Sequence, residues 1–330
     1  MPTALRRVAV IGASGFIGSH LADHLARLGS NVMAFAGSEI GLARMQAVLP
    51  HCQLAACHLL DTDRLQALIS EFHAEVVYHM AAHPDGQESF DQIRQCINTN
   101  LYGLTNALEA SARSGVSLFV YGDTSKVHGD LPAAHGEDAP VNPFSSYAIS
   151  KFGGWGVCKL VSDLTSMNVV SVRPEFTYGP RQSFNLFVHA HRCITQGKPI
   201  RLQGGAQTRD PLFVEDLVDL MARVIESPRS FGRVISAGGG REFSIFEMCQ
   251  ELVSVLGASI DIEPDAMPPR LTEIWRSRSD NSNAYRLLGW VPTTGLRAGL
   301  AKTYQPEGRS SNHSQDVVVR AAAAAAGGAS

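Results

Sequence analysis

The sequence contains few cysteines and places none of them at metal-binding spacing. Its six cysteines are scattered between Cys52 and Cys249, and no two of them form a Cys-x-x-Cys motif. This spacing argues against a zinc site and against a disulfide framework. We therefore expect a reducing compartment and no bound metal.

Long apolar runs and clusters of charge of one sign are also missing. Glycines interrupt the N-terminal apolar run, and no stretch approaches the ~18 apolar residues that a membrane span needs. Charged residues make up 18% of the 330 residues, the formal net charge is −3, and the basic residues are dispersed. This pattern argues against nucleic-acid binding. We expect a cytoplasmic protein with a full hydrophobic core in one large domain or two intimate ones.

Short apolar runs alternate with helical patterns through the first half of the chain. The expected strands are 8–11, 32–35, 53–57, 76–79, 118–121 and 169–172, and the expected helices are 19–28, 42–48, 62–72, 93–114 and 146–165. This alternation predicts an α/β fold with a doubly wound parallel sheet covered by helices on both faces. Ligands of such sheets bind beyond the carboxyl ends of the strands.

The regular alternation of strands and helices ends after Arg173, where proline and glycine become frequent. The expected elements there are helices at 185–196, 214–226, 244–256 and 284–288, a strand at 259–262 and a proline-rich loop at 264–270. We expect a smaller, interleaved C-terminal α/β lobe. The predicted division is a dinucleotide-binding domain at 1–173 with 209–235 returning to it, a substrate lobe at 174–208 and 236–303, and a disordered tail at 304–330.

Three glycines spaced three apart follow the first apolar run. Gly12, Gly15 and Gly18 stand between the expected strand 8–11 and a helical pattern. Strand, glycine turn and helix start are the arrangement that places a pyrophosphate on backbone N–H groups and a helix dipole. An ordinary glycine-rich turn is the alternative, but the strand–turn–helix context favours a dinucleotide site.

Tyr147 and Lys151 stand four residues apart within the expected helix 146–165. This spacing places both side chains on one helical face. A nearby ammonium favours the phenolate, so we expect Lys151 to lower the pKa of Tyr147 and make it a general base. A surface Tyr–Lys pair is the alternative, which the N-terminal glycine turn makes less attractive.

Together these motifs resemble the extended short-chain dehydrogenase/reductases, the NAD-dependent epimerase/dehydratase family that acts on nucleotide sugars. The resemblance covers about residues 8–303 and implies a Rossmann-type sheet. It implies that Tyr147 removes a sugar hydroxyl proton while the nicotinamide accepts the hydride. It also implies that Thr124 hydrogen-bonds the same oxygen and that Lys151 binds the nicotinamide ribose.

The resemblance further implies two ligand-binding sets and a homodimer formed through the helices at 93–114 and 146–165. The expected cofactor-binding residues are Gly12, Ser14, Gly15, Phe16, Ile17, Gly18, Ala36, His58, Leu59, Ala81, Ala82, Asn100, Lys151, Pro174 and Phe176. The expected substrate-binding residues are His83, Thr124, Ser125, Asn185, Leu186, Arg209, Arg270 and Glu273.

Five positions depart from the family pattern, among them His128, where a tyrosine is common, and Phe176, where a substrate-binding asparagine is frequent. Ala36 stands where NAD-using members place an acid for the adenosine ribose, which favours NADP and leaves NAD as the alternative. His58 stands where the family often has an aspartate. Lys126 stands where dehydratases and decarboxylases carry a glutamate, which disfavours both reactions.

The leading hypothesis is therefore an NAD(P)-dependent nucleotide-sugar epimerase, 4-epimerase-like, that works through a keto-sugar intermediate. An NADPH-dependent 4-keto-sugar-nucleotide reductase is the alternative, because Ala36 admits NADP. A dinucleotide-binding protein without turnover is a third hypothesis, which the intact Thr124, Tyr147 and Lys151 disfavour.

Overall fold

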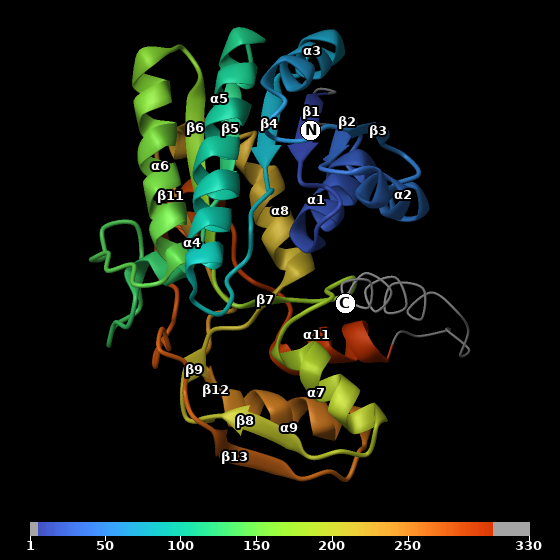
Figure 1. The fold of residues 1–330 in the computed structure, drawn as a ribbon, viewed down its shortest axis with the longest axis vertical. Helices are drawn as coiled ribbons and strands as arrows, with labels where there is room; N and C mark the ends of the chain where they lie inside the picture. The colour runs from blue at the N-terminus through green and yellow to red at the C-terminus, as the bar shows by residue number, and fades with distance from the viewer. Residues whose placement is uncertain (1–5, 306–330) are drawn as a thin grey trace.

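A seven-stranded sheet lies at the centre of the computed structural model, which describes residues 6–305 (Figure 1). Its strand order is β11-β6-β5-β4-β1-β2-β3, and every neighbouring pair is parallel. This sheet confirms the predicted α/β fold. The strands are β1 (Arg7–Ile11), β2 (Asn31–Ala36), β3 (Gln53–Ala56), β4 (Val76–His79), β5 (Leu118–Gly122), β6 (Asn168–Pro174) and β11 (Val234–Ala237).

Helices cover both faces of this sheet, as the apolar strands require. Successive residues of β1 point to opposite faces, so Val8 and Val10 join one core cluster while Ala9 and Ile11 join the other. The first cluster includes α1 (Phe16–Arg27), α2 (Glu39–Val48), α8 (Val214–Val224) and α10 (Ser282–Leu288). The second includes α3 (Thr62–Phe72), α5 (Leu104–Arg113) and α6 (Ser146–Leu164).

The helical pattern at 93–114 forms one long rod with a π-helical centre. It consists of α4 (Phe90–Cys96), the π-helical stretch η1 (Ile97–Gly103) and α5. Stretches of π-helix are rare and often occur at functional sites. Here the widened turn contains Asn100, which is buried against α6.

A smaller lobe lies beyond the carboxyl ends of the sheet strands (Figure 1). Its core includes residues of α7 (Leu186–Thr195), α9 (Ile245–Leu256) and α11 (Leu296–Tyr304). The sequence analysis did not predict α11. Its strand pairs are β7 (Thr177–Tyr178) with β10 (Leu212–Phe213), β8 (Ile200–Gln203) with β13 (Ile262–Met267), and β9 (Thr208–Arg209) with β12 (Phe243–Ser244).

The predictions of a strand at 259–262 and a loop at 264–270 are wrong. The strand is β13, which begins at Ile262 and includes Pro264. Proline is tolerated because β13 pairs only with β8 and its register shifts between Glu263 and Met267. An ion pair of 3.3 Å between Arg201 and Glu263 also joins the two strands.

The boundaries proposed between the two lobes stay a prediction. The expected tail lies, from residue 306 onward, outside the described residues. Across residues 6–305, no helix combines the length and the apolar character that crossing a membrane requires.

Candidate active site

The glycine turn between β1 and α1 fits a dinucleotide pyrophosphate. Gly12 has a φ of +87°, and a Cβ there would lie 2.5 Å from the backbone nitrogen of Ala81. A Cβ on Gly18 would collide with the carbonyl oxygen of Gly12. Gly15 is exposed at the N-cap of α1, and the described residues of the first helical turn include no acid. The backbone can therefore approach an anion closely, with the helix N-terminus directed at it.

The expected adenosine end of this cofactor site lies at the ends of β2 and β3. Ala36 is fully buried as the last residue of β2. The Ser38 hydroxyl already accepts a hydrogen bond of 3.2 Å from the Gly41 N–H as the N-cap of α2. His58 is exposed, and its Nδ1 accepts from the Leu60 N–H at 3.3 Å. No acidic side chain stands at the end of β2 itself.

The side chain of Asn100 hydrogen-bonds the segment after β4 and is not directed into an open cofactor site. Its Oδ1 accepts from the His83 N–H at 2.7 Å, and its Nδ2 donates to the His83 carbonyl oxygen at 3.1 Å. The same Nδ2 donates to Ser150 Oγ at 2.9 Å, which joins this segment to α6 next to Lys151. Asn100 therefore fixes the positions of Ala81 and Ala82 along the expected cofactor site.

The three expected catalytic residues come together at the carboxyl end of β5. Thr124 begins the short helix η2 (Ser125–His128), while Tyr147 and Lys151 lie in the first two turns of α6. The Tyr147 phenol lies close enough to the Thr124 side chain for that hydroxyl to lower the Tyr147 pKa. Lys151 is only 2% exposed, and its Nζ lies 4.2 Å from the ring centre of Tyr121.

The expected lowering of the Tyr147 pKa by Lys151 is wrong. Burial raises the pKa of Tyr147, the carboxylates of Asp123 and Asp85 raise it further, and the Thr124 hydroxyl lowers it in part. Burial also lowers the pKa of Lys151 to about 8, against the opposing effect of Asp123. The physical reason is position, because the Lys151 ammonium sits over the Tyr121 ring.

A buried ion pair behind Thr124 was missed. Asp123 Oδ1 accepts from the Thr124 N–H at 2.8 Å. Asp123 Oδ2 accepts from Arg173 Nε at 2.9 Å and from Ser171 Oγ at 2.8 Å. Arg173 also contacts His128 Nε2 at 3.0 Å. The position of Asp123 directly after an apolar strand is the sequence feature from which its role could have been predicted.

A second buried polar group, formed by Glu175 and His135, was also missed. His135 Nδ1 lies 3.5 Å from Glu175 Oε1, and Ser277 Oγ donates to Glu175 Oε2 at 2.7 Å. Burial raises the pKa of Glu175 to about 8 and lowers the pKa of His135 to about 4. Ser125, the expected substrate residue next to Thr124, lies close enough to Glu175 to oppose this rise in the Glu175 pKa. These residues come from distant parts of the chain, so no local sequence pattern predicts that they meet.

Two residues expected at the cofactor lie beside this group. Pro174 ends β6 and Phe176 follows Glu175. The ring of Phe176 meets Phe187 edge to face, with ring centres 5.7 Å apart, so it packs against the core of the smaller lobe.

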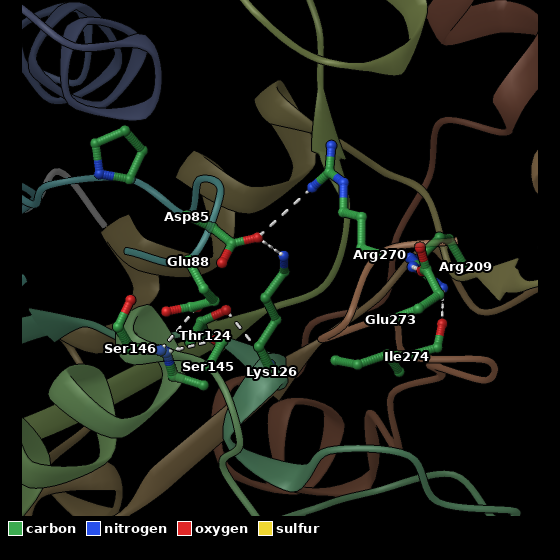
Figure 2. Close-up of polar contacts among 12 residues, drawn as sticks. Asp85, Glu88, Thr124, Lys126, Ser145, Ser146, Arg209, Arg270, Glu273 and Ile274 are labelled. Carbon is green, nitrogen blue, oxygen red and sulfur yellow. Dashed lines mark hydrogen bonds and ion pairs between the residues drawn. The ribbon is translucent and has the colours of Figure 1, made fainter. Parts of the chain in front are cut away.

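Figure 2 shows three of the expected substrate residues of the smaller lobe, Arg209, Arg270 and Glu273, on one side of Asp85 and Lys126. Arg209 Nη2 donates to Glu273 Oε1 at 2.6 Å in a largely buried ion pair. Arg270 is half exposed and donates to Gln203 Oε1 at 3.2 Å. Asn185 caps α7, which begins at Leu186, by accepting from the Val188 N–H. Only Arg270 of the two arginines is free to reach a diphosphate without breaking a close ion pair.

Comparison with known proteins points to one family. The model of the NAD dependent epimerase/dehydratase family matches residues 8–238. A UDP-glucose 4-epimerase of Mycolicibacterium smegmatis is 32% identical over 309 residues, covering 91% of this chain and 97% of the relative. The crystal structure of a UDP-glucuronic acid 4-epimerase of Bacillus cereus with UDP-glucuronic acid and NAD has a TM-score of 0.84 at 27% identity, covering 91% and 98%. A UDP-glucose 4-epimerase of Thermus thermophilus with NAD has a TM-score of 0.82 at 25% identity, covering 89% and 96%.

Proposed function

Because the chain belongs to the NAD-dependent epimerase/dehydratase family, we propose that it is an NAD-dependent epimerase of nucleotide-diphosphate sugars. The observation that carries this proposal is the meeting of Thr124, Tyr147 and Lys151 at the strand ends beside the glycine turn. The names of the relatives favour a UDP-hexose and inversion at C4.

The chemistry divides between cofactor and protein. When bound, NAD supplies the hydride acceptor and later the donor. Tyr147 Oη takes the proton of the sugar hydroxyl as the carbinol is oxidised, and returns it as the keto sugar is reduced. Thr124 Oγ1 hydrogen-bonds the same oxygen and stabilises the charge that develops on it. The keto sugar must rotate between the two half-reactions, so that the hydride returns to its opposite face and the carbon is inverted.

Lys151 and Asp123 set the charge around this proton transfer. The Asp123 carboxylate raises the pKa of both Tyr147 and Lys151, so it opposes the phenolate and favours the ammonium. Arg173 offsets the charge of Asp123 at 2.9 Å. Burial and the carboxylates of Asp123 and Asp85 therefore favour the protonated phenol of Tyr147.

At position 126 this chain has a lysine, where dehydratases and decarboxylases carry a glutamate. An ammonium at this position forms an ion pair with Asp85 and cannot supply the carboxylate that those reactions use. Epimerisation and keto reduction need only the residues already placed.

We propose NAD rather than NADP, against the tendency that Ala36 suggested. Solved relatives contain NAD, the Ser38 hydroxyl caps α2, and Glu39 in the next position would repel a 2′-phosphate. Calorimetric titration with NAD and NADP tests the choice. Tighter binding of NADP would overturn it, and Ala36→Asp should weaken NADP further while NAD is retained.

The reaction is tested by incubating the purified protein and NAD with UDP-glucose or UDP-galactose and following the sugars by NMR. The expected result is approach to one equilibrium mixture from both sides, without net NADH. Stoichiometric consumption of NADPH with a 4-keto sugar would establish the reductase instead. Absence of conversion across UDP-, dTDP- and GDP-hexoses would overturn the proposal.

We propose that the protein forms a homodimer through α4, η1 and α6. These elements expose a set of large apolar side chains that a monomer would leave in water: Ile93, Ile97, Ile149, Phe152, Leu160 and Leu164. Light scattering should give twice the chain mass at micromolar concentration, and Leu160→Glu should give the monomer. A monomeric wild type would contradict the proposal.

A further inference from the structure

An ion pair closes one side of the small hollow next to the catalytic residues (Figure 2). Lys126 Nζ donates to Asp85 Oδ2 at 2.5 Å. Arg270, from the smaller lobe, approaches the same oxygen at 4.0 Å. One oxygen of Asp85 is thus the nearest carboxylate to two cations, one from each lobe. The hollow is lined by Asp85, Lys126, Phe144, Ser145, Thr272 and Ile274.

The position of Lys126 in the chain ties it to the reacting part of the substrate. The Lys126 N–H donates to Thr124 Oγ1 at 3.4 Å, so one short turn carries both side chains. In the proposed function, Thr124 and Tyr147 contact the oxygen that loses its proton. The ion pair of Lys126 and Asp85 is then placed to contact a substituent on a neighbouring ring carbon, while Arg270 is available to the diphosphate.

The charges at this position balance without a substrate. The cations are Lys126 and Arg270, and the anions are Asp85 and Glu88, of which Glu88 accepts from the Ser146 N–H at 3.0 Å. An uncharged hydroxymethyl group could accept from Lys126 and donate to Asp85 at little cost. A uronic acid carboxylate would instead meet like charge and displace Asp85 from its cation.

We propose that the ion pair of Asp85 and Lys126 makes the site selective for nucleotide hexoses with an uncharged sugar over the corresponding uronic acids. This inference rests on the proposed function and names its substrate class. It distinguishes between two activities among the relatives, because one is named for UDP-glucose and another was solved with UDP-glucuronic acid. Asp85 is the residue that excludes the carboxylate, and Lys126 is the donor to the neutral group.

The test compares the dissociation constants of UDP-glucose and UDP-glucuronate for the NAD-loaded protein by calorimetry, so it does not depend on turnover. The wild type should bind UDP-glucose at least about tenfold more tightly. Asp85→Asn should shift the ratio toward UDP-glucuronate by about tenfold, because it leaves Lys126 uncompensated. Lys126→Met should shift it the other way. The double variant restores the charge balance and should return the ratio to near the wild-type value.

Asp219→Asn is the matched control, since it makes the same change in net charge on α8, where Asp219 pairs with Arg223 at 2.9 Å. Its ratio should equal that of the wild type. Preference of the wild type for UDP-glucuronate, or a ratio that Asp85→Asn leaves unchanged, would overturn the inference while leaving the nucleotide-sugar function intact. Failure to bind either ligand would overturn the inference for UDP-sugars, whereas the proposed function falls only if no UDP-, dTDP- or GDP-hexose is converted.

Discussion

Arg173 donates from Nε to Asp123 Oδ2 at 2.9 Å, and neither side chain is more than 3% exposed. The other carboxylate oxygen of Asp123 accepts from the Thr124 N–H. The ion pair therefore joins the end of β6 to the backbone of Thr124, whose hydroxyl we propose is catalytic. It lies behind the active site and supports it without occupying the opening.

Removal of Asp123 should destabilise the fold strongly. Asp123→Ala leaves the Arg173 guanidinium buried without its counter-charge, which costs about 3–5 kcal/mol of unfolding free energy. Urea denaturation measures this loss. Asp219→Ala removes the acid of an exposed ion pair with Arg223 and should cost no more than about 1 kcal/mol. Equal losses in the two variants would contradict the role given to Asp123.

Tyr147→Phe should abolish most activity and leave the fold unchanged. The variant keeps the ring and loses the oxygen that moves the proton, so kcat should fall by about 10²–10⁴. Affinity for NAD and the thermal unfolding midpoint should stay at wild-type values. Tyr102→Phe, on the exposed surface of η1, is the control and should keep full activity. A Tyr147→Phe enzyme with more than about a tenth of wild-type kcat would exclude Tyr147 as the base.

Glu175 should make stability depend on pH. Because burial raises the pKa of this carboxyl from 4.5 to about 8, the folded chain keeps a proton that the unfolded chain releases. Its contribution to stability is thus fully present below about pH 4.5 and is lost as pH rises toward 8, by about 1.4 kcal/mol per pH unit at most.

Glu175→Gln keeps a neutral hydrogen-bonding side chain and removes this titration. In urea denaturation at pH 5 and pH 8.5, the variant should gain stability over the wild type as pH rises. Other groups titrate equally in both proteins, so their effect cancels in the difference between the two free energies of unfolding. A difference that is independent of pH would show that Glu175 is already ionised in the folded chain.

Much of the fold followed from local pattern, because strands buried on both faces are nearly continuous in apolar residues. The expected strands at 76–79 and 118–121 coincide with β4 and β5 to within a residue. β13 was missed because Glu263, Pro264 and Asp265 break every strand pattern, and only pairing with β8 makes this segment extended. Pairing across the lobe overrode local preference there.

The site shows the same division between local and long-range information. Tyr147 and Lys151 were predicted as a pair because one helical turn joins them, and Gly12 was predicted from the spacing of three glycines between a strand and a helix; its φ is positive. Glu175, His135 and Ser277 meet only through tertiary folding. The pKa of Tyr147 could not be predicted either, since it depends first on burial and then on Asp123 and Asp85, which follow two different strands.

Two glycines of α6 should respond in opposite ways to alanine. A Cβ at Gly154 would collide with Tyr121 Oη and lie 2.9 Å from Leu104 Cδ2. Tyr121 Oη donates to the Lys151 carbonyl at 3.1 Å, and its ring underlies the Lys151 ammonium. Gly154→Ala should therefore cost about 1–3 kcal/mol of unfolding free energy and also lower kcat, because it displaces Lys151.

Gly156 is exposed two residues later, and a Cβ there would meet no atom within 4 Å. Gly156→Ala should raise the unfolding free energy by up to about 1 kcal/mol, since alanine favours the helix. Urea denaturation repeated at several protein concentrations separates this effect from any change in the proposed dimer, whose face includes Gly156. If Gly154→Ala proved as stable and as active as Gly156→Ala, the close packing of α6 on Tyr121 would not be what positions Lys151.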